Sequence, residues 1–285
     1  MTVLLLFGGC VKDFNIGGNS TGVTINSVFT DLDTMRLYLT KSTGGNIPPE
    51  AMPGISDAKV QLYEDDILAG TMAYVPSGTN PTFGYYAWPG KARAGHRYHV
   101  VANGTDFSLS ATDTVPPKIP IGVAKIVSRS KNKIHYRFTF SDDYARRDYY
   151  RINLWVYGYK NAVDSLGDTV AVAYANALRV PNDGTLADTV RDFGKWLLFS
   201  DSGFNGNEKQ IDMTFSVADT TKVLNEWLLV ELNHVSPAYY DYMRTTNLYY
   251  QSSYLSEPVH IYTNVPNGTG AFVGQHVNQF LYLMK

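Results

Sequence analysis

The sequence has little cysteine, little net charge and no long apolar run. Cys10 is the only cysteine among 285 residues, which excludes intramolecular disulfides. The net charge of −2 leaves no basic footprint for nucleic acid. No stretch after the first residues approaches the roughly 18 apolar residues of a membrane span. We therefore expect a fold that depends on burial alone, and a membrane attachment, if one exists, through lipid.

Motifs that mark catalytic sites are also scarce. The sequence has no His-Glu-x-x-His, no Walker loop and no dinucleotide fingerprint. A match to the nucleophile elbow, Gly18-Asn-Ser-Thr-Gly22, lies in a polar stretch and not at a strand-to-helix turn. The pairs Asp65-Asp66 and Asp142-Asp143 are predicted to be turn residues. We predict no enzyme and no catalytic residue, although a glycan hydrolase with carboxylates from distant segments stays an alternative.

The first ten residues are apolar and end in Gly8-Gly9-Cys10. This pattern is typical of a lipoprotein signal, in which the cysteine is lipidated, so that its thiol is an anchor and not a catalyst. The apolar segment is shorter than the roughly 7–15 residues of a complete signal and has no basic start. We interpret residues 1–10 as a truncated signal that ends at lipidated Cys10, and residues 11–24 as a flexible tether. A buried strand around Cys10 is the alternative.

The composition favours strands, because the chain has 21 tyrosines and 13 phenylalanines with abundant valine and threonine. Apolar residues alternate with polar ones around Leu37, Phe138, Leu154 and Met213, as in half-buried strands. Turn signals rich in glycine and proline separate these runs. The sequence therefore predicts a mostly β protein built of sandwich-like domains.

Two domains and one helix follow from the same reading. Prolines at residues 115–120 predict an extended connector, so we place a first β-sandwich at 25–115 and a second β-rich domain, with one or two short helices, at 121–285. A helix near 237–250 is indicated by Ser236 as its N-cap and Pro237 at its first position. Its aromatic residues either dock on the second sheet or face a partner.

Several motifs, taken in order, resemble one family. They are Ile55-Ser-Asp-Ala-Lys-Val-Gln-Leu-Tyr63, Gly84-Tyr-Tyr86, Gly95-His-Arg-Tyr98, Asp148-Tyr-Tyr-Arg151, Phe199-Ser-Asp-Ser-Gly-Phe-Asn-Gly206, Ser236-Pro-Ala-Tyr-Tyr-Asp-Tyr242 and Thr263-Asn-Val-Pro-Asn-Gly-Thr-Gly-Ala-Phe272. The chain resembles the Bacteroidota outer-membrane lipoproteins catalogued as domain of unknown function 4249. The third motif looks like the strand entry of an immunoglobulin-like or carboxypeptidase-regulatory-like sandwich, which implies that fold for 25–115.

The resemblance implies a location and a partner but no established activity. It implies an outer-membrane lipoprotein, anchored in the membrane lipid through Cys10 and often encoded beside a TonB-dependent receptor. Lys12 and Asp13 resemble a degenerate signal for export to the cell surface. We expect an accessory or ligand-binding role with such a receptor in nutrient uptake, with an unknown ligand and no nucleic acid. An adhesin or envelope-structural protein is the alternative.

Candidate site residues are aromatic, because aromatic rings stack on sugars and anchor protein interfaces. A ligand or partner is predicted to contact Tyr85, Tyr86, Trp88, Tyr239, Tyr240 and Tyr242, all of which have core packing as their alternative. No cofactor is expected. The loop of Asp201 and Asn205 faintly resembles a calcium loop, so calcium is the weak metal prediction. The alternative is a turn in which Asp201 binds backbone amides and Asn205-Gly206 are left-handed.

Overall fold

The computed structural model describes residues 22–41, 54–77, 84–130, 133–163, 165, 167–182, 184–191, 195–217, 223–252 and 259–284. The predicted lipidation at Cys10 and export signal at Lys12 and Asp13 lie outside these residues, as does most of the predicted tether. Described elements follow in chain order: β1 (Val23–Thr30), β2 (Thr34–Lys41), β3 (Lys59–Glu64), β4 (Ile67–Pro76), β5 (Gly84–Lys91), β6 (Arg97–Asn103), β7 (Ser108–Thr114), β8 (Ile121–Ser130), β9 (Lys133–Ser141), β10 (Tyr149–Val163), β11 (Thr169–Ala177), β12 (Ala187–Arg191), β13 (Trp196–Ser200), β14 (Glu208–Ser216), β15 (Val223–Val235), α1 (Pro237–Gln251) and β16 (Thr269–Leu283).

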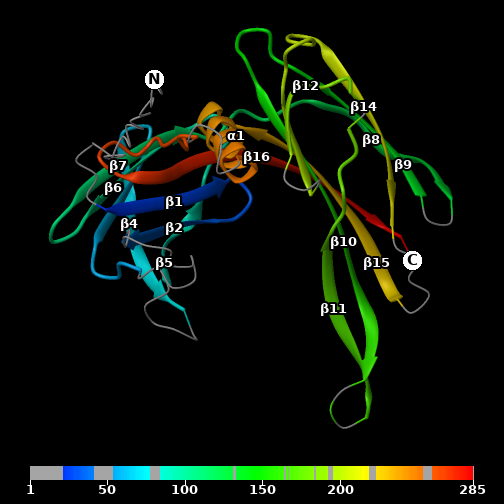
Figure 1. Cartoon of the computed structure of the whole chain (residues 1–285), viewed down its shortest axis with the longest axis horizontal. Coiled ribbons are helices and arrows are strands. Elements are labelled where there is room, and N and C mark those ends of the chain that lie inside the picture. The colour runs from blue at the N-terminus through cyan, green and yellow to red at the C-terminus, as the bar shows by residue number, and fades with distance from the viewer. Residues whose placement is uncertain are drawn as a thin grey trace, which may run out of the picture.

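One long sheet runs through the whole molecule. Its strands lie in the order β12-β13-β10-β15-β16-β1-β2-β5-β4-β3-β6-β7, and β11 pairs with β10 beside this path. A separate sheet has the order β14-β9-β8. The two ends of the long sheet form two lobes, which diverge on either side of α1 (Figure 1). We call β1–β7 the first lobe and β8–β15 the second lobe.

The strand β16 belongs to both lobes. Its first part pairs in parallel with β1, with Thr24 opposite Thr269, and its second part pairs antiparallel with β15, with Trp227 opposite Leu283. The two pairings meet at Gln275. Since side chains alternate along a strand, β16 presents one face to both cores, and the first part of its other face packs against α1.

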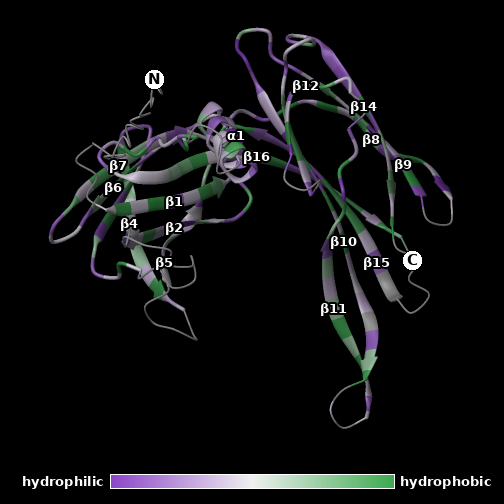
Figure 2. Cartoon of the chain, in the orientation of Figure 1, coloured by the Kyte–Doolittle hydropathy of each residue, from purple (hydrophilic) through white to green (hydrophobic). Residues whose placement is uncertain are grey.

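Each lobe has its own apolar core on the same face of the long sheet. In the first lobe, Leu37 and Tyr98 pack with Phe272 of β16. In the second lobe, Phe138 and Leu154 are fully buried, and Phe280 of β16 packs against them. The alternation read around these strands is therefore confirmed, and Figure 2 shows apolar and polar residues alternating along many strands.

The helix α1 covers the opposite face where the lobes meet. Ser236 caps it by accepting a hydrogen bond from the Tyr239 backbone N–H at 3.0 Å, and Pro237 is its first residue. Tyr239 and Tyr240 are buried against Ala271 and Val273 of β16 and against β13. The predicted helix is thus confirmed, and it docks on the sheet.

The predicted class, mostly β, is confirmed, with open sheets in place of a barrel. The description as two sandwich-like domains stays a prediction. Part of the predicted second domain packs in the first lobe, because Val265 and Phe272 belong to the core of that lobe. The chain therefore returns to the first lobe near its C-terminus, and the lobes share a strand.

Candidate binding groove

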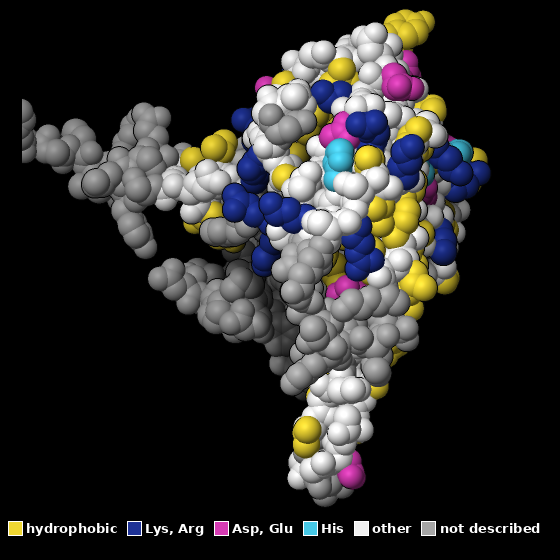
Figure 3. Space-filling view, turned by 90° about the vertical axis from the view of Figure 1, so that its right-hand side faces the viewer, with side chains coloured by type: hydrophobic (Ala, Val, Ile, Leu, Met, Phe, Trp, Pro, Cys, Tyr) yellow, Lys and Arg dark blue, Asp and Glu magenta, His cyan; other side chains and the backbone are white. Residues whose placement is uncertain are grey.

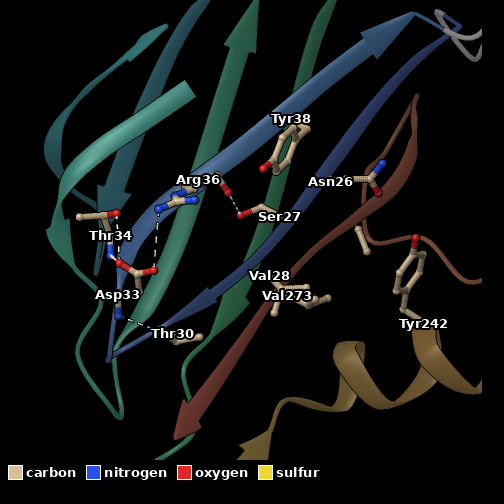
Figure 4. A pocket seen from close by; sticks show the side chains of 11 residues that line it. Asn26, Ser27, Val28, Thr30, Asp33, Thr34, Arg36, Tyr38, Tyr242 and Val273 are labelled. Atoms are coloured by element: carbon tan, nitrogen blue, oxygen red, sulfur yellow. Dashed lines mark hydrogen bonds and ion pairs between the residues drawn. The ribbon is translucent and has the colours of Figure 1, made fainter. Parts of the chain in front are cut away.

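An open groove lies between α1 and the face of the first lobe that is turned away from its core (Figure 4). Its volume is about 440 Å³. Residues from β1, the β1–β2 turn, β2, α1 and β16 line it: Asn26, Ser27, Val28, Thr30, Asp33, Thr34, Arg36, Tyr38, Tyr242, Ala271 and Val273. We call this the α1 groove.

The floor of the α1 groove follows from strand alternation. Along β1, Val23, Ile25 and Phe29 point into the first core, so Asn26 and Val28 point the other way. Val28 lies opposite Val273 of β16 and is 50% exposed. An exposed valine at the centre of a paired strand gives the floor an apolar spot.

The wall formed by β2 is aromatic and basic. Arg36 and Tyr38 point away from the core on either side of Leu37, which is fully buried. The guanidinium of Arg36 lies over the ring of Tyr85 on β5, 5.2 Å from its centroid, and the rings of Tyr38 and Tyr85 are 5.8 Å apart. Stacking on Tyr85 holds the Arg36 side chain against the sheet while its charge remains accessible.

The β1–β2 turn closes one end of the α1 groove. The Thr30 hydroxyl accepts hydrogen bonds from the backbone N–H groups of Leu32 and Asp33, and the Asp33 carboxylate accepts one from the Thr34 N–H at 2.7 Å. Asp33 also lies 4.0 Å from Arg36. Both side chains are largely exposed in this pair, so solvent screens the attraction and leaves Arg36 available to another anion.

Tyr242 supplies the wall on the side of α1. It is half-buried, and burial raises the pKa of its phenol above the usual value. Its hydroxyl therefore stays protonated. The ring points from the helix toward the groove in Figure 4.

These groups can bind but offer little to catalysis. Tyrosine rings give flat apolar surface with a polar tip, Arg36 gives a positive charge, and Asn26 gives an amide. Asp33 is the only carboxylate among the lining residues. The α1 groove suits a ligand or segment that combines an apolar or ring-shaped part with an anionic or polar group.

The predicted aromatic residues of β5 occupy three different environments. Tyr85 lies beside the α1 groove through its contacts with Arg36 and Tyr38. Tyr86 is 2% exposed in the first core and its hydroxyl accepts a hydrogen bond from the Ala58 N–H, so its ring has the core packing that was its alternative. Trp88 is half-buried and packs against that core.

The predicted tyrosines of α1 also separate. Tyr239 is 1% and Tyr240 is 6% exposed, because both face the sheet, so both rings have the core packing that was their alternative. Tyr242 remains a candidate, since it lines the α1 groove. The prediction from sequence did not include Arg36 and Tyr38. Tyr38 alternates with apolar residues that are buried, and this position in a strand indicates an exposed ring.

The predicted calcium residues lie in a tight turn. Asp201 is buried, and its carboxylate accepts a hydrogen bond from the Asp148 N–H at 2.7 Å instead of from its own turn. Asn205 is exposed, and of the pair predicted to be left-handed only Gly206, with φ 75°, has a positive φ. Across the described ranges, no group of three or more His, Cys, Asp or Glu is placed to hold a metal ion. Calcium binding stays a prediction.

The polar groups near Asp201 form a buried network instead. Asp148 lies 3.1 Å from His234 and 2.6 Å from Arg146. Burial raises the pKa of Asp201, and the nearby charges of Asp142 and Asp148 raise it further. The network ties β10, β13 and β15 together at the junction of the lobes.

Comparison with family models decides the family. A model described as a domain of unknown function, DUF4249, matches residues 12–280. This chain belongs to the DUF4249 family. The membership confirms the resemblance of its motifs to that family and assigns no activity. No curated protein matches the chain.

Two solved structures resemble the DUF4249 chain distantly. A β-glucuronidase of Parabacteroides merdae is 11% identical, with a TM-score of 0.20, and the match covers 73% of this chain and 23% of the enzyme. An entity described as manganese lipoxygenase of Gaeumannomyces graminis and partial zonadhesin of Komagataella pastoris is 10% identical, with a TM-score of 0.20, and the match covers 77% and 90%. At these scores neither likeness carries an argument. Within the described ranges, the single helix is too short and polar to span a membrane.

Proposed function

We propose that this DUF4249 protein is a lipid-anchored protein of the outer-membrane surface that binds a partner or ligand through the α1 groove. The partner is a TonB-dependent receptor, or the nutrient which that receptor imports. The observation that carries the proposal is the set of exposed Arg36, exposed Tyr38 and half-buried Tyr242 around an apolar floor. These side chains belong to neither lobe core. Aromatic and arginine side chains at the surface are common anchors of binding sites.

The anchor in this proposal is Cys10. Its position after Gly8-Gly9 supports lipidation, and the polar stretch that follows supports a tether between lipid and fold. Lys12 and Asp13 support export to the surface. A tethered protein is held near membrane receptors, so that even a modest affinity of the α1 groove suffices for a stable complex.

Binding is favoured over catalysis by the chemistry of the α1 groove. A hydrolase needs an acid and a base, or a nucleophile, facing the reacting bond. The α1 groove offers one carboxylate, Asp33, which already binds the Thr34 N–H. The finer fold, two sandwich-like domains of which the first is immunoglobulin-like, belongs to the same proposal.

Affinity purification from outer membranes tests the proposal. Tagged protein is isolated in mild detergent beside three variants: Cys10→Ala, Tyr38→Ala with Arg36→Ala, and Val123→Lys. The last carries a charge on β8 of the second lobe, where Val123 is 37% exposed. We expect the unchanged protein and Val123→Lys to recover one TonB-dependent receptor in stoichiometric amount, because both keep the groove.

The other two variants separate anchor from groove. The double groove variant is expected to stay in the membrane and lose the receptor, whereas Cys10→Ala is expected to leave the membrane fraction. If the unchanged protein is recovered without a receptor, this result would contradict the proposal that a TonB-dependent receptor is its partner. Undiminished recovery by the groove variant would contradict the role of the α1 groove.

A further inference from the structure

The edge of β11 that faces away from β10 is unpaired among the described residues. β11 pairs antiparallel with β10, from Thr169 opposite Val163 to Ala177 opposite Trp155. No strand among the described residues pairs with the other side of β11. It has nine residues, none of them charged or proline, and seven are exposed. Together with β10 it forms an arm that projects beyond the rest of the second lobe (Figure 1). An unprotected edge of this kind is a template for another strand.

The other strands at the ends of the sheets are protected. The β12 carbonyl groups of Asp188 and Arg191 accept hydrogen bonds from Tyr240 and Asn247 of α1. At β7, the Thr112 carbonyl accepts one from Asn264. Covering side chains thus occupy these two edges.

Charge and irregularity protect the two edges of the separate sheet. β8 carries exposed Lys125 and Arg129 and has two register shifts, and β14 carries Glu208, Lys209 and Asp212. In Figure 3 basic side chains gather over the upper part of the face shown. Among the described residues, β11 itself therefore has none of these protections.

The two faces of the arm differ in side-chain size. Ala171, Ala173, Ala175 and Ala177 lie on one face of β11, directly opposite Asn161, Tyr159, Tyr157 and Trp155 of β10. The rings of Trp155 and Tyr157 stack at 6.4 Å, and Tyr159 meets Trp227 of β15 at 6.4 Å. A row of small side chains therefore lies between the open edge and a row of rings.

We propose that the β11 edge receives an extended, uncharged segment of a partner polypeptide that carries large apolar side chains at every second residue. Backbone hydrogen bonds to β11 give the pairing its affinity. Large side chains of the added strand reach across the alanines to Trp155, Tyr157 and Tyr159, because neighbouring strands are only about 4.8 Å apart. This surface is separate from the α1 groove, and the inference stands without the proposed function.

A second copy of this chain fits the edge less well. A two-fold axis normal to the sheet pairs β11 with β11 and keeps each face on the same side. The copy would then present only alanines and Thr169 beside the alanine row, and nothing would reach the rings. The row of alanines beside the rings of β10 therefore favours a partner strand with larger side chains.

A peptide experiment tests this inference. The probe is a labelled peptide as long as β11 with alternating leucine and threonine, and its control has the same composition with the leucines consecutive. Binding is measured by fluorescence anisotropy and by hydrogen exchange of the full chain. We expect the alternating peptide alone to bind and to slow exchange of the β11 amides.

Three variants locate the bound peptide. Val172→Lys, which puts a charge on β11, is expected to weaken binding at least about tenfold, equal to about 1.4 kcal/mol. Trp155→Ala is expected to weaken it without altering the edge. Val123→Lys is the matched control, since Val123 and Val172 are exposed valines of edge strands, at 37% and 40%, and it should bind normally.

Each other outcome overturns the inference. Absence of slowed exchange in β11, equal binding of both peptides, or normal binding by Val172→Lys would each do so. Sedimentation that shows a dimer dissolved by Val172→Lys would assign the edge to a second copy instead. If Val172→Lys fails to fold, as judged by circular dichroism, Val170→Lys on the same face replaces it.

Discussion

Asp113 of β7 accepts a hydrogen bond from the hydroxyl of Ser236, the residue that caps α1. The same carboxylate accepts one from the Gly274 N–H of β16 at 2.8 Å. One side chain therefore ties the last strand of the first lobe to the helix and to the strand that both lobes share. Burial raises the pKa of Asp113 to about 6, although both hydrogen bonds oppose the shift.

Asp113→Asn is expected to change how stability depends on pH. The folded protein keeps the Asp113 proton up to about pH 6, whereas the unfolded chain releases it near the ordinary pKa of 3.8, so stability falls as pH rises between these values. The unchanged protein should lose on the order of 2 kcal/mol relative to Asp113→Asn between about pH 4 and pH 7. Urea unfolding of both proteins at the two pH values measures this. A difference that does not vary with pH would contradict the buried, protonated carboxyl.

Ser236→Ala should destabilise the protein at neutral pH by about 1–2 kcal/mol, since it removes a helix cap and leaves Asp113 with one donor fewer. Ser252→Ala, at the other end of α1, is the comparison, and its loss should be smaller. The measurement is the free energy of unfolding in urea. Equal effects of the two substitutions would show that the junction does not depend on the contact between Ser236 and Asp113.

Phe272→Ala tests the shared strand. The Phe272 ring is fully buried in the first core, 4.4 Å from the ring of Phe29, so its loss should cost about 3–5 kcal/mol. Leu281→Ala, on the same strand but 62% exposed, should change stability by less than about 0.5 kcal/mol. Because β16 pairs with both lobes, we expect calorimetry to show a single shifted transition. Two separate transitions, only one of them shifted, would mean that the lobes unfold independently.

Substitution of the neighbouring tyrosines Tyr85 and Tyr86 of β5 should affect stability and partner binding differently. Tyr86→Ala should cost about 3–5 kcal/mol of stability, because the ring is buried in the first core. Tyr85→Ala should cost less than about 1 kcal/mol while weakening receptor recovery, since it releases Arg36 from its stacked position. Thermal unfolding and affinity purification of both variants measure these effects. Loss of stability in Tyr85→Ala comparable to that in Tyr86→Ala would place Tyr85 in the core.

Local features of the fold were predictable from sequence. Alternation around Leu37 and Phe138 identified buried faces, since the period of two is a property of the strand itself. Ser236 and Pro237 marked the start of α1 through backbone chemistry that acts over one turn. The pair Asp65-Asp66 indicated a turn, and both residues have positive φ between β3 and β4.

Long-range relationships were not predictable in the same way. Nothing in the residues around Thr24 indicates that β1 pairs in parallel with residues from Thr269 onward. The same limit applies to the α1 groove, because Val28, Arg36 and Tyr242 meet only through that pairing and the docking of α1. Of the six aromatic residues proposed from sequence, those that pack in a core could not be told from exposed ones without knowing which face each strand buries.

Site-specific photo-cross-linking in cells tests the central claim, partner binding through the α1 groove. A photoreactive phenylalanine analogue replaces Val28 on the groove floor in one strain and Val123 on β8 in another, both exposed valines. The account predicts a cross-link from position 28 to a TonB-dependent receptor of the outer membrane, lost when Arg36 and Tyr38 are also changed to alanine. Cross-links to the receptor from position 123 and none from position 28 would contradict it.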